Sequence, residues 1–411
     1  MQADKATLED LSIFKGDEAG AVIDKINRAR TSIGKARLEQ HLKKPLPNRQ
    51  TILDVQKTIT AVGAAIDSWP DNISNGTIMV IEKFYEAPVD PIPEKASAWN
   101  FFFYKLLHSP DHSLALYSAK HALDLIIGLH RIKMLLTKED NPTPLRICLS
   151  EIDRIFSKTG WEKYTSLEAM GTQHHMLAFA SSLKHKYKEP VFELLRCFAQ
   201  LDSWYGMAAA ARELNLVFPE FTGSEEPVFE AKGLYHLLLD KPTGYDVHLH
   251  TGKNFLFLTG ANMSGKSTFI KSIGSAAMLA HAGMGVPAAE LRLSFFDELI
   301  SHINVADDIT RGESYFFNEV RRIRTTVERV CEKGHQLVLM DELFKGTNIQ
   351  DAMKCSMAII EGLARSRQSI FILSTHLYEI AEDLKNRENI EFSYFETEIS
   401  EQKFLFHYSL K

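Results

Sequence analysis

The chain has 411 residues, which is long enough for two or three domains, and we take two as the working number. Hydrophobic residues make up 45% of the sequence and charged residues 24%, values typical of soluble globular proteins, which excludes wholesale disorder and fibrous classes. The formal net charge of -6 gives no global sign of nucleic-acid binding, so any such surface has to be local.

The cysteines and the absence of a long apolar run bear on the compartment. Cys148, Cys197, Cys331 and Cys355 are far apart in the sequence and form no CxxC pair, which favours scattered reduced thiols over a disulfide framework or a zinc cluster. No run of about 18 apolar residues is present, and the amino terminus is charged where a signal peptide is apolar. We therefore predict a cytoplasmic, unexported protein without membrane association.

From residue 1 to about 225, apolar residues recur at helical spacing, as in Val22, Ile26 and Ile33. Clusters of Pro and Gly predict helix breaks near residues 44–47, 87–93, 141–144 and 189–190. The spacing and the breaks together predict an α-helical domain over residues 1–225.

One segment of this helical part is basic. Between Ala21 and Thr60 there are nine lysines and arginines against three acidic residues, a local net charge of +6. A solvated helix face and a nucleic-acid surface both fit such a segment, and the sequence leaves the two interpretations open.

The pattern changes after the polar stretch from Pro219 to Pro227, which is typical of a linker. Short apolar runs bounded by turns then follow at residues 255–259, 337–340 and 369–374, as expected for strands buried in a mainly parallel sheet. A terminal hairpin is expected, with strands over residues 390–397 and 404–410. The second predicted domain is thus α/β and covers residues 226–411.

A phosphate-binding motif follows the first of these strands. The stretch Gly260–Ser267 matches the pattern G-x-x-x-x-G-K-S/T between a predicted strand and a helical pattern. In such a P-loop the glycines let backbone amides converge on phosphate groups, Lys266 neutralises the β and γ oxygens, and the Ser267 hydroxyl coordinates Mg²⁺. We therefore predict ATP and Mg²⁺ as ligands. The predicted binding residues are Gly260, Asn262, Met263, Ser264, Gly265, Lys266, Ser267 and Thr268.

Polar residues at the ends of the two later strands complete the predicted site. Asp341 and Glu342 follow the second strand, and we expect Asp341 to reach the metal and Glu342 to orient the attacking water. His376 follows the third strand, where it is expected to hydrogen-bond the γ-phosphate or the water, a purely structural role being the alternative. The predicted reaction is the hydrolysis of ATP to ADP and phosphate, with Lys266, Glu342 and His376 as catalytic residues.

These motifs resemble, in order and approximate spacing, the ATPase domain of the MutS family over roughly residues 235–410. Further matching stretches are Gly285–Ala288, Ala306–Asp308, Gly312–Phe316 with Glu319, and Asp341–Thr347. The resemblance implies an ABC-type P-loop ATPase whose sites are completed across a homodimer, with Ser314 reaching the nucleotide of the opposite subunit. It assigns no role to Arg311, which we interpret as a surface charge.

The amino-terminal half resembles the core and lever of the same family more loosely, through a Thr31-x-x-Gly34 corner and a Pro45-Leu46 turn. The family's mismatch-reading and connector domains, inserted DNA clamp and carboxyl-terminal extension have no counterpart in the sequence. Phe84-Tyr85-Glu86 repeats the family's mismatch wedge but lies within the lever, so we interpret it as a coincidence.

Three other patterns receive cautious interpretations. The aromatic run Trp99–Tyr104 is expected in a core or an interface rather than stacked on bases. His108 and His112 have i, i+4 spacing, but Pro110 argues against a shared zinc ion. Tyr245 is a weak substitute for the aromatic residue that stacks on adenine in the family.

The predicted function is that of an ATP-dependent DNA-binding protein of repair or recombination, in the class of mismatch-repair and DNA-damage proteins. It would bind duplex or branched DNA through residues 21–60 and act as a homodimer. The alternative is a MutS-derived nucleotide switch that acts on a protein partner without DNA. A transport ATPase is disfavoured because the transporter-type Ser-Gly-Gly signature is absent and the helical half is not membrane-like.

Overall fold

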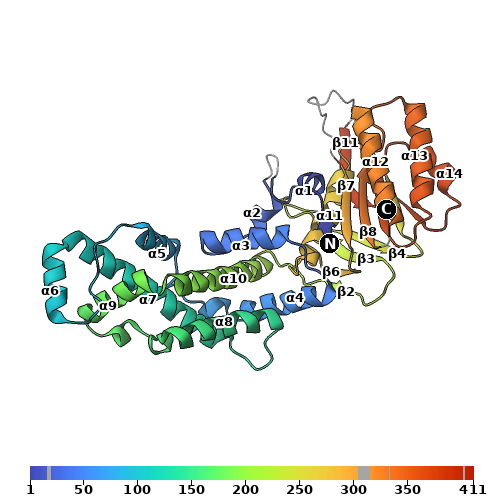
Figure 1. Ribbon diagram of the computed structural model, residues 1–411. Coiled ribbons are helices and arrows are strands. Elements are labelled where there is room, and N and C mark those ends of the chain that lie inside the picture. The colour runs from blue at the N-terminus through green and yellow to red at the C-terminus, as the bar shows by residue number, and fades with distance from the viewer. Residues whose placement is uncertain (16–19, 304–314, 333, 401–402) are drawn as a thin grey trace. The chain divides into compact units, whose positions relative to one another are not determined.

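The computed structural model describes residues 1–15, 20–303, 315–332, 334–400 and 403–411 (Figure 1). The chain forms two compact units. Unit 1 consists of Met1–Ile26, Leu42–Gln56 and Ala210–Lys411, and unit 2 of Asn27–His41 and Lys57–Ala209. Segments of the two units alternate along the chain. The domain boundary at residue 225 stays a prediction. No helix among the described residues is both long and apolar enough to cross a membrane.

Unit 2 is helical, as expected from the spacing of its apolar residues. The predicted breaks at residues 44–47, 87–93 and 141–144 fall between helices or at a helix start, whereas residues 189–190 lie in the first turn of a helix that begins at Lys188. Three α-helices have residues in both units, namely α3 (Ser32–Lys43), α4 (Arg49–Gly63) and α10 (Lys188–Glu213). The others in unit 2 are α5 (Asn75–Glu86), α6 (Ala98–Leu107), α7 (Ser109–Leu136), α8 (Thr143–Thr159) and α9 (Gln173–His185). Short 3-10 helices lie at Ile66–Ser68, Trp161–Lys163 and Leu167–Met170.

The start of α3 is fixed by a buried carboxylate. Asp202 of α10 is fully buried, and its side chain accepts hydrogen bonds from the backbone amides of Arg30 and Thr31, at 3.0 and 2.9 Å, and from the Thr31 hydroxyl at 2.6 Å. A Cβ atom at Gly34 would lie 2.0 Å from the Asp202 Oδ2 atom, so this position requires glycine. The Thr31-x-x-Gly34 corner therefore binds the Asp202 carboxylate at the N-terminus of α3, a position where a carboxylate is stabilising.

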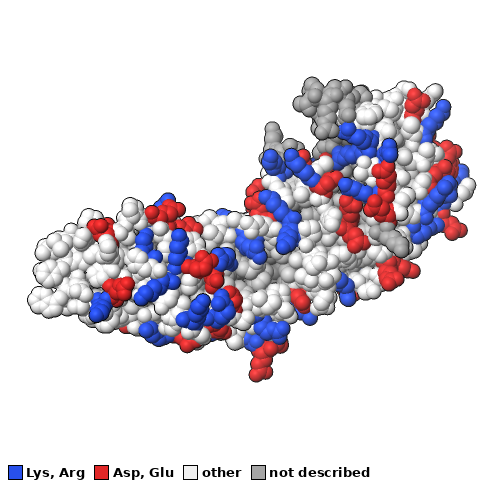
Figure 2. All heavy atoms as spheres, viewed as in Figure 1, with Lys and Arg blue, Asp and Glu red and all other residues white. Residues whose placement is uncertain are grey.

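The aromatic run on α6 lies at the surface of unit 2. Trp99, Phe102 and Phe103 are 73%, 56% and 50% exposed, while Tyr104 is buried and donates a hydrogen bond to the carbonyl of Asp90 at 3.1 Å. Figure 2 shows few charged side chains around α6. A place in the core is therefore wrong for these three rings, which leaves the interface interpretation.

The stretch Phe84-Tyr85-Glu86, interpreted above as a coincidental match to the mismatch wedge, has a buried phenylalanine ring. Phe84 is only 2% exposed, and Glu86 forms an ion pair with Lys83 on the same helix at 2.6 Å. An aromatic ring that fills the core cannot insert into a base stack, so the structure agrees with a coincidental match.

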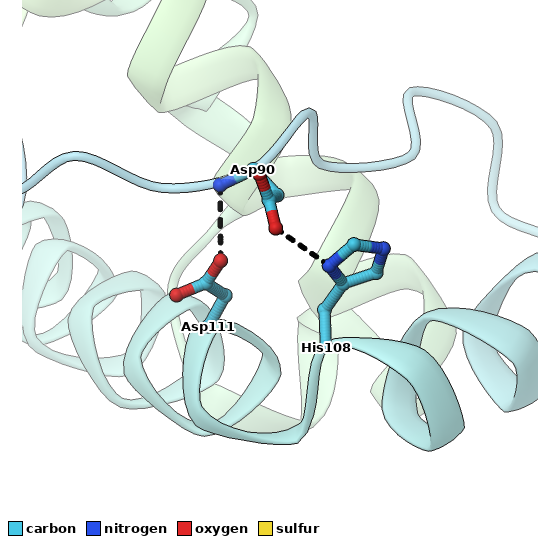
Figure 3. Close-up of side chains that lie close together, drawn as sticks. All are labelled: Asp90, His108 and Asp111. Carbon is cyan, nitrogen blue, oxygen red and sulfur yellow. Dashed lines mark hydrogen bonds and ion pairs between the residues drawn. The ribbon is translucent and has the colours of Figure 1, made fainter.

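The two histidines with i, i+4 spacing have different surroundings. His112 is buried, with its ring 4.7 Å from that of Phe101, whereas His108 precedes the first turn of α7. Figure 3 shows that the Nδ1 atom of His108 lies 2.7 Å from Asp90 Oδ2 and that Asp111 accepts a hydrogen bond from the Asp90 amide at 2.9 Å. This ion pair and this loop hydrogen bond account for the positions of the three side chains.

Unit 1 is built on a seven-stranded sheet with the order β1-β7-β8-β9-β5-β10-β11. The strands are β1 (Gln2–Ala3), β5 (Phe255–Thr259), β7 (Glu298–His302), β8 (Gln336–Asp341), β9 (Ile370–Ser374), β10 (Ile390–Ser400) and β11 (Lys403–Leu410). Adjacent strands are parallel except β10 and β11, which pair antiparallel. The three predicted strands and the terminal hairpin are thus confirmed.

Helices cover both faces of this sheet, as its continuous apolar runs require. On one face, α12 (Tyr315–Cys331), α13 (Ile349–Leu363) and α14 (Ile380–Leu384) pack on alternate residues of β8 such as Val338 (Figure 1). On the other face lies α11 (Lys266–His281), where a Cβ atom at Gly274 would come within 2.8 Å of Leu339. Glycine here permits the close approach of α11 to the strand.

A second, four-stranded sheet with the order β2-β6-β3-β4 was not predicted. Its strands are β2 (Glu220–Phe221), β3 (Val228–Leu234), β4 (Tyr245–His250) and β6 (Glu290–Leu293). The strand β4 alternates strictly between buried and exposed residues, which is the usual pattern of a sheet with one solvated face. That alternation was the available signal in the sequence. The strand β2 falls in the stretch assigned to the linker and within residues expected to be helical.

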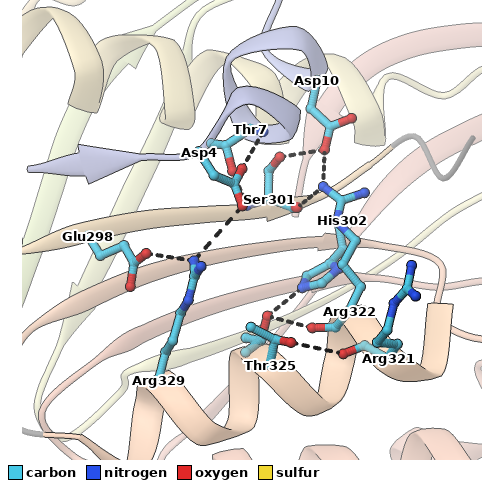
Figure 4. A network of polar contacts seen from close by, with 11 residues as sticks. Asp4, Thr7, Asp10, Glu298, Ser301, His302, Arg321, Arg322, Thr325 and Arg329 are labelled. Atoms are coloured by element: carbon cyan, nitrogen blue, oxygen red, sulfur yellow. Dashed lines mark hydrogen bonds and ion pairs between the residues drawn. The ribbon is translucent and has the colours of Figure 1, made fainter. Parts of the chain in front are cut away.

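The first residues of the chain also belong to unit 1. The strand β1 extends the large sheet beside β7, and α1 (Lys5–Asp10) follows it. Figure 4 shows the polar contacts of this segment. The buried carboxylate of Asp10 accepts hydrogen bonds from the Ser301 hydroxyl at 2.5 Å and from Arg322 at 3.2 Å, and the Thr7 hydroxyl accepts one from the Ser301 amide at 3.1 Å. These contacts join α1 to β7 and α12. The remaining helix of this part is α2 (Val22–Ile26).

Candidate functional site

The predicted site residues meet at one edge of the large sheet. Because β8, β9 and β5 are parallel neighbours, their carboxyl ends lie side by side, and ligands of open α/β sheets bind outside such ends. The loop that starts at Gly260 follows β5 and leads into α11, whose first residue is Lys266. Asp341 ends β8 and is followed by Glu342. The two predicted motifs are therefore brought together by the strand order.

A cavity of about 450 Å³ lies over this edge, a size typical of small-molecule sites. It is lined by Leu239, Lys241, Thr243, Tyr245, Asn262, Met263, Ser264, Gly265, Lys266, Ser267, Thr268 and Glu342. The residues from 262 to 268 and Glu342 were predicted as site residues. The sequence analysis missed Lys241 and Thr243, which lie in the turn before β4, because that turn belongs to the sheet that was not foreseen.

The backbone around the cavity is strained. Of the five described residues other than glycine with positive φ, three are here, namely Met263 at 64°, Glu342 at 58° and Phe344 at 61°. Such conformations cost on the order of 1–3 kcal/mol each and gather at functional sites. The backbone of Phe344 is fixed by the buried Glu319 of α12, because the Oε1 atom of Glu319 accepts a hydrogen bond from the Phe344 amide at 2.5 Å. Burial raises the pKa of Glu319.

The ammonium group of Lys266 is held inside the loop. Its Nζ atom donates hydrogen bonds to the carbonyl oxygens of Gly260 and Ala261, at 2.9 and 3.0 Å. Burial lowers the pKa of Lys266, while the carboxylates of Glu342 and Asp341 act in the opposite direction. The result is a positive charge at the N-terminus of α11, the usual place for a bound anion.

Ser267 and Asp341, whose oxygen atoms could bind a metal ion, come from the same edge of the sheet. The Ser267 hydroxyl donates a hydrogen bond to Asp341 Oδ2 at 2.5 Å, and the Ser374 hydroxyl donates one to the other oxygen of the same carboxylate. Asp341 is 6% exposed. A buried carboxylate beside a hydroxyl is a donor set that suits a hard divalent cation such as Mg²⁺.

Glu342 and His376 contact each other at the mouth of the site. The Nε2 atom of His376 lies 2.5 Å from Glu342 Oε1, and the Lys345 ammonium lies 3.5 Å from Glu342 Oε2. The carboxylate is 28% exposed and so remains accessible to water. The sequence predicts that His376 faces the phosphate or the water, whereas in the structure its ring lies against Glu342. The two residues follow the adjacent parallel strands β8 and β9.

Tyr245 lines the cavity, but its ring packs against two phenylalanine rings. It lies edge-on to Phe269 and Phe395, with centroid distances of 5.2 and 5.7 Å, and the residue is only 5% exposed. Its contacts are those of a core residue. Ser314, for which the family resemblance implies a role at the opposite site, and Arg311, interpreted as a surface charge, lie outside the described residues.

Comparison with known proteins gives the family. The profile of MutS domain V matches residues 256–411. Relatives named DNA mismatch repair protein MutS include one from Halalkalibacterium halodurans, 30% identical over 50% of this chain and 24% of its own length. Others are from Carboxydothermus hydrogenoformans, 32% identical over 47% of this chain and 24% of the relative, and from Thermotoga maritima, 32% identical over 48% and 25%. The chain thus matches about a quarter of the length of these relatives. With the P-loop and most of the lining residues of the cavity inside the matched range, the chain is related to the MutS family over residues 256–411, the part that resembles MutS domain V.

Proposed function

We propose that the chain binds ATP with Mg²⁺ at the edge of the large sheet and hydrolyses it. The observation that carries the proposal is the cavity at which the P-loop, the hydrogen-bonded pair of Ser267 and Asp341, and the half-buried carboxylate of Glu342 come together. A P-loop NTPase of the ABC type needs these parts in this order around one site. The strained backbone at Met263 and Glu342 supports the same conclusion.

Each part has a distinct task in the proposed reaction. The amides of the loop and the ammonium of Lys266 bind the phosphate oxygens, and the N-terminus of α11 adds its partial positive charge. Ser267 and Asp341 would hold the metal ion, which when bound helps to neutralise the charge of the transferring phosphoryl group. The carboxylate of Glu342 orients the attacking water.

His376 acts in this proposal through Glu342. A contact of 2.5 Å between its Nε2 atom and the Oε1 atom of the carboxylate restricts the rotamers of Glu342. We therefore assign His376 as a positioning residue for the water-orienting carboxylate. The sequence interpretation, in which His376 touches the phosphate, requires the ring to leave Glu342.

DNA is the partner that the relation to this family supports, because the matched relatives carry the name of DNA mismatch repair proteins. We propose that exposed lysines of the basic segment, such as Lys35, Lys44 and Lys57, contact the phosphate backbone. Other cations of the segment have internal partners, including Arg37, whose Nε atom donates to Gln200 at 2.6 Å, and Arg49, which donates to the carbonyl of Phe221 at 3.0 Å. Pairing of two ATPase domains, with Ser314 completing the opposite site, belongs to the same proposal.

Steady-state ATP hydrolysis tests both halves of this function. We expect homoduplex, mismatched or four-way-junction DNA to change the rate, and the change to fade between roughly 50 and 200 mM salt, because phosphate contacts release counterions. Substitution of Lys35, Lys44 and Lys57 by glutamate should weaken the response to DNA. Matched substitutions of Lys138, Lys158 and Lys163, which are exposed lysines outside the segment, should preserve it.

The outcomes separate the two halves. Hydrolysis that ignores every DNA at both salt concentrations would remove DNA from the proposal and favour a switch that acts on a protein partner. An absence of hydrolysis under all conditions, with and without DNA, would remove the ATPase itself.

A further inference from the structure

Unit 2 contains a cavity of about 780 Å³ that has no part in the proposed ATPase site. It lies among α3, α8 and α10. Its apolar wall includes Ile33, Ala36 and Trp204, and Arg37 and Glu151 are among its charged lining residues. Cys148 and Cys197 also line it. A space of this size gives small solutes access to two thiols that are otherwise buried.

The two cysteines are neighbours in the fold although 49 residues separate them in the sequence. Cys148 comes from α8 and Cys197 from α10, and they are 8% and 9% exposed. The Cys148 thiol donates a hydrogen bond to the carbonyl oxygen of Cys197, with 3.8 Å between Sγ and the oxygen, so Cys148 contacts Cys197 directly. The sequence interpretation of scattered thiols is therefore wrong for this pair.

The contact between the two side chains affects their acidities in opposite directions. It lowers the pKa of Cys197 against the opposing effect of burial, whereas it raises the pKa of Cys148, as burial also does. Because the thiolate is the nucleophile in thiol chemistry, we take Cys197 as the attacking thiol of the pair.

We propose that Cys148 and Cys197 form a peroxide-responsive dithiol that closes to an intramolecular disulfide between α8 and α10. The thiolate of Cys197 attacks one oxygen of hydrogen peroxide, which gives a sulfenic acid and releases the other oxygen as water after protonation. The sulfur of Cys148 then attacks the sulfenyl sulfur, and a second water leaves with the remaining thiol proton. Two thiols are oxidised by two electrons in total, and one peroxide is reduced to two waters.

The arrangement has the parts that such chemistry requires. A redox-active cysteine needs a lowered pKa, access to the oxidant and a resolving thiol within reach. Cys197 meets these requirements through its lowered pKa, the cavity and the neighbouring Cys148. Reversible disulfides of this kind are the form expected where structural disulfides do not persist.

Peptide mapping under non-reducing conditions tests the proposal on the unmodified chain. Exposure to hydrogen peroxide should produce a cross-linked peptide pair that contains Cys148 and Cys197, with the mass of two hydrogen atoms lost, and dithiothreitol should reverse it. Because the bridge closes a long loop, the melting temperature of unit 2 should rise by roughly 5 °C or more in the oxidised form.

Single substitutions distinguish the roles of Cys148 and Cys197 in the proposed reaction. In a background with Cys331→Ser and Cys355→Ser, Cys197→Ser should abolish the response to peroxide, while Cys148→Ser should leave Cys197 as a sulfenic acid that dimedone traps. The exposed Cys331 of the wild type is the internal reference for oxidant dose. Oxidation of Cys331 without any cross-link between Cys148 and Cys197, or over-oxidation of Cys197 to a sulfinic acid in the presence of Cys148, would overturn the proposal.

Discussion

Glu342→Gln is expected to lower the steady-state rate of ATP hydrolysis by at least about 100-fold while ATP still binds, because a positioned carboxylate contributes roughly that much or more to proton transfer. The amide keeps the size of the side chain but loses the charge that orients water. The amide oxygen can take the place of the Oε1 atom, which lies 2.5 Å from His376 Nε2. The loss should therefore appear in kcat rather than in KM.

The control for this substitution is Glu388→Gln, which makes the same change at an exposed position of unit 1. We expect its hydrolysis to match that of the wild type. Hydrolysis by Glu342→Gln within a few-fold of the wild type would show that another group orients the water, and the assignment of Glu342 would have to be withdrawn.

Asp202→Ala is expected to destabilise unit 2 by about 3 to 5 kcal/mol, because it leaves the buried amide and hydroxyl of Thr31 and the partly buried amide of Arg30 without their acceptor. Gly34→Ala should cost about 1 to 3 kcal/mol, since the new methyl group collides with the Asp202 carboxylate at 2.0 Å. The two effects should not add. In the Asp202→Ala background the collision is gone, so Gly34→Ala should then cost much less.

Urea unfolding followed by tryptophan fluorescence measures these effects in the right unit, because Trp69, Trp99, Trp161 and Trp204 are the only tryptophans of the chain and all belong to unit 2. Asp140→Ala, at an exposed carboxylate of the same unit, is the matched control and should change the stability by about 0.5 kcal/mol or less. Strictly additive losses from Asp202→Ala and Gly34→Ala would contradict the proposed contact.

The sequence predicts the strands that carry the candidate site because their signals are local, whereas β1, β7 and the four-stranded sheet were not predicted. Strands such as β5 and β9 are short apolar runs buried on both faces, and the P-loop requires its glycines within a few residues. Once three parallel strands are placed, their carboxyl ends have to meet. The proximity of Lys266 to Asp341 and Glu342 follows from that topology before any coordinates are known.

The features that escaped the sequence depend on residues far apart in the chain. Nothing near Asp10 indicates that its carboxylate bonds to Ser301, and nothing near Cys148 points to Cys197. The pairing of β1 with β7 could not be predicted either, because the two residues of β1 are too few to give a strand pattern. Tertiary contacts of this kind override local propensity, which is why the start of the chain was assigned to the helical domain.

Mg²⁺-dependent binding of a fluorescent ATP analogue tests the central claim most directly, in the wild type, in Lys266→Ala and in Lys271→Ala, which removes the next lysine along α11. We predict that the wild type and Lys271→Ala bind the analogue alike and that Lys266→Ala binds at least about tenfold more weakly, because it loses charge-assisted hydrogen bonds to phosphate. Equal binding by all three proteins, or none by the wild type, would contradict a nucleotide site at this edge of the sheet.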